Sequence, residues 1–272
     1  MPEPDWSRAR PAHPDDLGLT RRTHLTGLFA AFTTVALLGE TACAQPQRRM
    51  AARDWIDRQG ELARAFKRGE LAPLAWMAEV ERLAAEIDVA ELMAEIDSAQ
   101  ITAQALPPTN DPHKRSVRFI DADGEPRRLG FGAALFDFTP ANVITPHGHR
   151  HMASSHLIVD GRFRIRNFDR IGDVGVSGGP GEAMIIRPTR DMVAGVGALS
   201  AMTSARDNIH WFVPQGGTAR TFDVVISGLD AGQPDYAIRA IDPLGGEQRA
   251  DGTIIASVID FETASARYTA AI

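Results

Sequence analysis

The stretch "TPHGHRHMASSHLIVDG", Thr145 to Gly161, decides the fold and the site, because it places four histidines in ten positions and ends at an Asp-Gly pair. The whole chain of 272 residues has eight histidines. Side chains on a β-strand alternate between its faces, so residues two apart project the same way, about 6.6 Å apart along the strand. His147 and His149 should therefore share one face, and imidazoles at that spacing can bind one metal ion.

Two histidines alone rarely make a tight metal site, so a third ligand is needed from another part of the chain. His210, in the strand-like segment "RDNIHWFVP", is the best remaining candidate. A neighbouring strand of the same β-structure could present it. The sequence therefore predicts a metal site formed by His147, His149 and His210.

The chain changes character at "LPPTNDP", Leu106 to Pro112. Beyond it, short strands alternate with glycine and proline turns, and the Asp160-Gly161 pair predicts a β-hairpin. This spacing is typical of an all-β sandwich or barrel, which we place at residues 106–272. The strand-like segments are "SVRFID", "LGFGAALFDF", "SSHLIVDGRFRIRNF", "AMIIRP", "NIHWFVP", "ARTFDVVIS" and "GTIIASVIDF".

The preceding segment, residues 45–105, has helical periodicity. Gly69 and Pro73 separate its first two helices, and Asp88 is placed to cap a third. The apolar positions are Trp55, Leu62, Phe66, Trp76, Val80, Leu83, Ala84, Ile87, Val89, Leu92 and Ile96. We expect a helical hairpin that packs on the β-structure; helices that mediate a homodimer are the alternative.

The N-terminus, residues 1–44, is predicted to be a twin-arginine-type signal peptide. Arg21-Arg22 precede an apolar run from Leu25 to Leu38, and Ala42-Cys43-Ala44 is a small-x-small cleavage site. Cleavage after Ala44 would leave no stable membrane span and a mature chain without cysteine, in the periplasm or secreted. An uncleaved anchor and lipidation of Cys43 remain open.

Composition narrows the possible partners. The formal net charge is −6 and 44% of the residues are hydrophobic, which fits a globular protein with a sizeable core. There is no basic stripe and no zinc-finger or RNA-binding motif, so no nucleic-acid partner is expected.

The histidine pattern resembles the cupin superfamily, whose first motif runs His-x-His, then usually a Glu, then a Gly. Here it reads His147-Gly148-His149, Ser154 in place of the Glu, and Gly161, while His210 lies where the second motif has its last ligand. The resemblance implies a cupin-type double-stranded β-helix barrel (jelly roll) preceded by an α-helical N-terminal segment.

In lacking the Glu of the first motif, the sequence resembles one branch of the cupin superfamily, the thiol dioxygenases of the cysteine and cysteamine type. "TPHGHRHM" and "DNIHWFVPQGGTARTFDVVISG" carry this likeness, which covers most of Arg118 to Gly228. It implies a three-histidine iron site and an oxygenase that uses dioxygen and a small thiol or similar metal-chelating substrate. Together with the predicted signal peptide, this indicates an exported enzyme. Imidazole suits several divalent ions, so Mn, Zn and Ni remain open beside Fe(II).

Two further residues are candidates for catalysis. Ser154 would take the vacated fourth position, and His156, which has the same strand parity, should point inside the barrel. His156 could carry protons, donate a hydrogen bond to a ligand, or be a core histidine. His151 lies where the alternation shifts, which indicates a loop or bulge.

Two alternative functions remain open. One is a non-catalytic carrier or sensor, whose metal site would be closed by His151 or His156 as a fourth ligand. The other is a metal-dependent isomerase or hydrolase.

Overall fold

The computed structural model describes residues 49–107, 109–149, 151–176, 179, 181–229 and 238–269; the predicted signal peptide, residues 1–44, lies outside them. The helices are α1 (Ala52–Lys67), α2 (Pro73–Ala84), α3 (Val89–Glu95), α4 (Ser98–Thr102) and α5 (Phe261–Thr269). The strands are β1 (His113–Val117), β2 (Gly132–Phe138), β3 (Ile144–Gly148), β4 (Met152–Asp160), β5 (Arg162–Val174), β6 (Ala183–Gly195), β7 (Leu199–Met202), β8 (Ile209–Pro214), β9 (Ala219–Ser227), β10 (Arg239–Gln248) and β11 (Ile254–Ile259).

The predicted N-terminal helices are present, and their ends follow the expected signals. Pro73 is the first residue of α2, where its missing N–H costs no hydrogen bond. The Asp88 carboxylate accepts hydrogen bonds from the backbone N–H groups of Ala90 and Glu91, so it caps α3. Gly69, just after α1, has φ +72°, which glycine adopts without strain.

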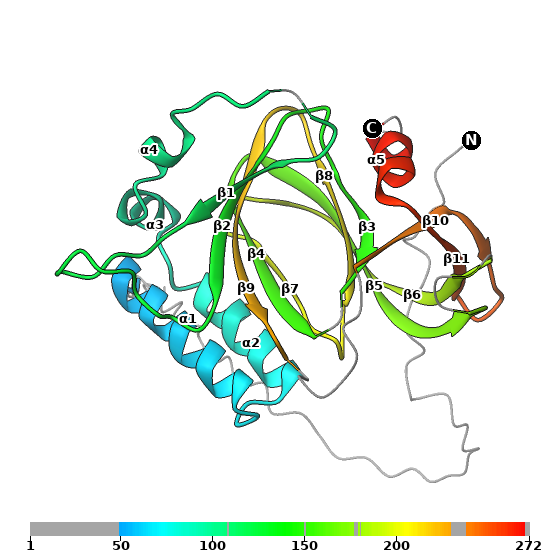
Figure 1. The fold of residues 1–272 in the computed structure, drawn as a ribbon, viewed down its shortest axis with the longest axis horizontal. Helices are drawn as coiled ribbons and strands as arrows, with labels where there is room; N and C mark the ends of the chain where they lie inside the picture. The colour runs from blue at the N-terminus through cyan, green and yellow to red at the C-terminus, as the bar shows by residue number, and fades with distance from the viewer. Residues whose placement is uncertain are drawn as a thin grey trace, which may run out of the picture.

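These helices cover the outer face of one β-sheet (Figure 1). Trp55 of α1 and Trp76 of α2 are buried in one cluster with Leu157 of β4 and Phe222 of β9. A tryptophan buries roughly 150–250 Å², which at about 25 cal/mol per Å² stabilises the fold by roughly 4–6 kcal/mol before entropy is counted. The apolar faces of α1 and α2 are thus buried against the β-sheet of the same chain.

The strands form two antiparallel units. One is a five-stranded sheet with the order β1-β2-β9-β4-β7, and the other is a closed six-stranded barrel with the order β10-β11-β6-β5-β8-β3. Apolar side chains from both units, among them Ile158 and Phe212, form a cluster between them. Strand alternation places Ile209 on the other face of β8, in a separate cluster with Phe168. The predicted all-β architecture with an N-terminal helical segment is confirmed.

The predicted hairpin at Asp160-Gly161 is wrong. β4 pairs with β7 and β9, whereas β5 pairs with β6 and β8, so the chain crosses from one sheet to the other at Gly161. Gly161 has φ +70°, and a Cβ there would lie 2.6 Å from the carbonyl oxygen of Thr218. The Asp-Gly pair therefore makes a tight corner between sheets, and a local sequence pattern does not distinguish that corner from a hairpin.

The last predicted strand is also shorter than expected. β11 ends at Ile259, and the helix α5 follows, which the strand-like pattern "GTIIASVIDF" had not suggested. Asp260 accepts hydrogen bonds from the backbone N–H and the hydroxyl of Thr263 and so caps this helix. Within the part of the chain that the structure describes, no helix combines the length and the hydropathy that a membrane crossing requires.

Candidate metal centre

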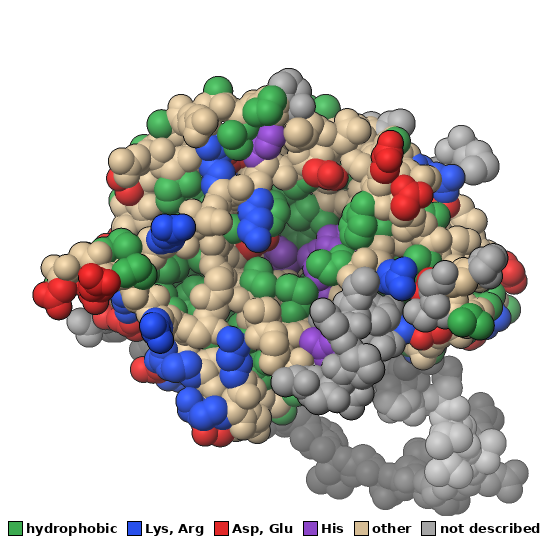
Figure 2. All heavy atoms as spheres, in the orientation of Figure 1, with side chains coloured by type: hydrophobic (Ala, Val, Ile, Leu, Met, Phe, Trp, Pro, Cys, Tyr) green, Lys and Arg blue, Asp and Glu red, His purple; other side chains and the backbone are tan. Residues whose placement is uncertain are grey.

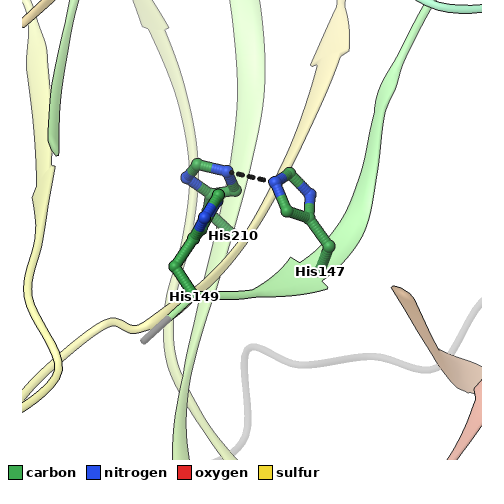
Figure 3. Close-up of side chains that lie close together, drawn as sticks. All are labelled: His147, His149 and His210. Atoms are coloured by element: carbon green, nitrogen blue, oxygen red, sulfur yellow. Dashed lines mark hydrogen bonds between the residues drawn. The ribbon is translucent and has the colours of Figure 1, made fainter. Parts of the chain in front are cut away.

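The structure brings the three predicted ligands together in the space between the two units. His147 of β3 and His210 of β8 are directly opposite each other in the strand register, and His149 follows the end of β3. The backbone N–H of His149 donates to the carbonyl of Asn208, 3.1 Å away, which extends that pairing. The ligand atoms of all three lie within 4.8 Å of one another, and their rings turn toward one another (Figure 3).

The His147 ring is oriented by the backbone of Thr145, two residues earlier in the chain. Its Nδ1–H donates to the carbonyl oxygen of Thr145 at 2.7 Å, so Nε2 is the nitrogen that carries the lone pair. That Nε2 lies 3.2 Å from Nε2 of His210. A carbonyl partner on the far nitrogen fixes the tautomer of a metal-binding histidine and raises its basicity.

All three rings are held in the neutral form that binds metal. Burial, with a smaller contribution from the neighbouring His156, lowers the pKa of His147 to about 4, although the hydrogen bond to the Thr145 carbonyl opposes the shift. Burial, followed by the neighbouring histidines, also lowers the pKa of His149 and His210 well below the usual value. A metal ion at this site would therefore displace no protons near neutral pH.

The donor set fits a divalent ion. Nitrogens that bind one ion at 2.0–2.1 Å lie about 3 Å apart, close to the separation between His147 and His210. No carboxylate belongs to the three-histidine group, so a divalent ion would keep its full charge. The site lies where the space-filling surface is hollowed, with histidine side chains visible at the bottom of the hollow and hydrophobic ones around them (Figure 2).

Ser154 and His156 lie beside the centre but outside the ligand group. The Ser154 hydroxyl contacts Nε2 of His156 at 2.9 Å, and Nδ1 of His156 contacts Oδ2 of Asp223 at 2.8 Å. All three side chains are buried. The His156 ring centroid is 4.7 Å from that of His210, so His156 points into the interior between the two units, as its strand parity predicts.

Asp223 was not anticipated from the sequence. A signal did exist, because it is a lone acid in the apolar strand "ARTFDVVIS", at a position that pairs directly with His156 in the register. Phe261, at the start of α5, was also missed; its ring centroid lies 5.8 Å from that of His147. Phe212 lines the other side, 5.6 Å from His210.

His151 is not brought into the ligand group. The expected break in alternation occurs, since β3 ends at Gly148 and β4 begins at Met152. His151 has φ +57°, an unusual backbone conformation for a residue with a side chain. It lines a separate cavity of about 320 Å³ together with Arg170 and Asn208.

No protein-family model matches the sequence, and no curated protein matches it. Solved structures do resemble the fold. A conserved protein with a double-stranded β-helix domain from Klebsiella pneumoniae is 14% identical, with a TM-score of 0.31, over 47% of this chain and 82% of that chain. An oxalate oxidase is 17% identical, with a TM-score of 0.31, over 47% and 58%. A cupin superfamily protein from Desulfitobacterium hafniense is 11% identical, with a TM-score of 0.29, over 45% and 84%. On its own strand order and pairing, the chain has an antiparallel, two-unit fold of a five-stranded sheet and a closed six-stranded barrel.

Proposed function

We propose that this chain is an exported, iron-dependent cupin oxygenase that acts on a small thiol or a similar metal-chelating substrate. The observation that carries the proposal is the group of three neutral histidines, without a carboxylate, in the interior between the two β-units. Such a ligand set leaves positions for further ligands and favours an anionic one, such as a thiolate, because the ion keeps its charge.

The neighbouring histidines support an open site over a closed storage site. Both ring nitrogens of His156 are engaged, one by Ser154 and one by Asp223, so neither is available as a fourth ligand. Among the described residues, His151 does not join the group either. This argues against the carrier or sensor alternative, which needs a fourth protein ligand.

When bound, divalent iron would supply the redox chemistry with dioxygen and lower the pKa of the coordinating thiol. The residues of this chain would do the rest. His147, His149 and His210 would hold the ion, while Phe212 and Phe261 contact the histidine rings from different sides. His156 and Ser154 provide the polar hydrogen-bonding groups of the interior.

The proposed reaction balances without an external reductant. A thiol and one dioxygen give a sulfinic acid: the S–H bond and the O–O bond break, two S–O bonds form, the proton ends on a product oxygen, and sulfur loses the four electrons that dioxygen gains. The test is oxygen uptake by iron-loaded protein with a panel of small thiols, with His210→Ala as control. Uptake that depends on both the thiol and His210 supports the proposal, and no uptake with any thiol contradicts it.

Export is part of the same proposal. Arg21-Arg22 and the small-x-small site that ends at Ala44 support a twin-arginine route, which would carry the folded, metal-loaded protein out of the cytoplasm. Metal analysis of protein from its native host tests the choice of ion. Zinc, nickel or manganese at full occupancy would favour the isomerase or hydrolase alternative over the oxygenase.

A further inference from the structure

Phe261, the first residue of α5, lies beside the metal centre and is open to solvent at the same time. It is 44% exposed, and its ring centroid lies 5.8 Å from that of His147. Among the large hydrophobic residues that are exposed in the described part of the chain, it is the only aromatic one. Phenylalanine is one of the residues most often buried, so an exposed phenylalanine next to a metal ligand suggests a function.

The metal centre is closest to solvent on the side of His147. His210 is buried, at 3% exposure, whereas His147 is only partly buried. The hollow in the surface has histidine side chains at its bottom and hydrophobic side chains around them (Figure 2). A small molecule that enters from solvent therefore reaches the centre past His147, on the side where Phe261 lies.

The contacts of α5 hold Phe261 in this place. At the other end of the helix, Tyr268 is fully buried, with its ring centroid 4.9 Å from that of Trp211. The Tyr268 hydroxyl also donates a hydrogen bond of 2.9 Å to Asp242 of β10. Trp211 follows the ligand His210 in β8, so the helix is anchored to a strand that carries a ligand. The position of Phe261 relative to the centre is thus fixed by packing.

An exposed aromatic ring is an apolar surface that favours another apolar group over water. A thiol that binds the ion through its sulfur leaves the rest of its carbon chain toward the solvent side of the centre, where Phe261 lies. An aryl group on that chain gains further from an edge-to-face or offset-stacked contact with the ring. A charged or hydroxylated tail gains no such contact and loses hydration.

We propose that Phe261 is a specificity-determining residue that receives the apolar end of the metal-bound substrate, so that the centre favours thiols with an aryl group over thiols with a polar tail. This inference rests on the proposed function. It adds to that function the class of thiol and a residue outside the ligand set that selects it.

Thiol binding to the Co(II)-loaded protein, followed by the thiolate-to-metal charge-transfer absorption, tests the preference without turnover. Phenylmethanethiol, ethanethiol and 2-mercaptoethanol share a CH₂–SH group and differ in the rest of the molecule. In Phe261→Ala, phenylmethanethiol should bind about tenfold more weakly because the ring contact is lost, whereas the affinities of the other two should change by less than about twofold.

Two further variants serve as controls. Phe261→Leu keeps an apolar side chain and should retain most of the affinity for phenylmethanethiol. Leu74→Ala removes a side chain of α2 that is 56% exposed, and it should change none of the affinities. An equal change for all three thiols in Phe261→Ala, or no change for any of them, overturns the proposal. An effect of Leu74→Ala as large as that of Phe261→Ala does so as well.

Failure of the earlier proposals is recognised separately. Wild-type protein that binds no Co(II) contradicts the metal centre, and Co(II)-loaded protein that binds none of the thiols contradicts the proposed function. Both results also overturn the role of Phe261. Wild-type protein that binds all three thiols without a preference for phenylmethanethiol overturns the role of Phe261 alone.

Discussion

His147 and His210 are 63 positions apart in the chain, yet they face each other across β3 and β8 with their Nε2 atoms 3.2 Å apart. The pairing register alone produces this closeness. A slip of one residue would turn either side chain to the opposite face of its strand, and Trp211, the next residue, is indeed packed on the other side against Tyr268. The metal centre is therefore a consequence of how these two strands pair.

The pH dependence of stability should reveal the neutral histidines. In the unfolded chain they titrate near their usual pKa of about 6.5, whereas His147 in the fold has a pKa of about 4. Between these pH values the unfolded state binds more protons than the folded state. The free energy of unfolding of the metal-free protein should therefore be highest above about pH 6.5 and decrease as the pH drops toward about 4. Urea unfolding across this range measures it. The dependence should be shallower in His147→Gln, and an identical dependence in both proteins would contradict the account.

The corner at Gly161 should tolerate no side chain. Gly161 has φ +70° and a Cβ there would meet the backbone of Thr218, whereas Gly252 has φ +80° with open space around it. In Gly252→Ala, the free energy of unfolding should therefore decrease only by the conformational cost of about 1–2 kcal/mol. In Gly161→Ala, it should decrease by roughly a further 1–3 kcal/mol because of steric overlap. Denaturant unfolding compares the two variants, and equal losses would show that the corner is not sterically tight.

Export should depend on the paired arginines. We expect Arg21→Lys combined with Arg22→Lys to leave the precursor in the cytoplasm, because the twin-arginine route reads the arginine pair and lysine does not replace a guanidinium. Arg48→Lys combined with Arg49→Lys, a matched pair beyond the predicted cleavage site, should leave export unchanged. Cell fractionation measures the location of both double variants. The mature N-terminus should be Gln45, and export that survives loss of the first pair would point to another route.

The sequence was sufficient for the parts of the fold and site that depend on local patterns. Strand alternation identified His147 and His149 as neighbours, and helical periodicity located α1 to α3. Parity also placed His156 inside, although its catalytic role and that of Ser154 stay predictions.

Other features depended on pairings between distant segments. Asp223 escaped notice because a single acid in an apolar strand is only a weak local signal, and its partner, His156, is 67 positions away. The hairpin at Gly161 was wrong for the same reason, since only the pairing of β4 and β5 with other strands shows that they belong to different units.

Metal content of the purified protein tests most directly the central claim that three imidazoles bind one ion between the two β-units. The wild-type protein should carry one divalent ion per chain. His210→Ala should lose that ion, whereas His151→Ala, which alters a nearby histidine outside the group, should keep it. Wild-type protein without metal, or His210→Ala with its metal retained, would contradict the account.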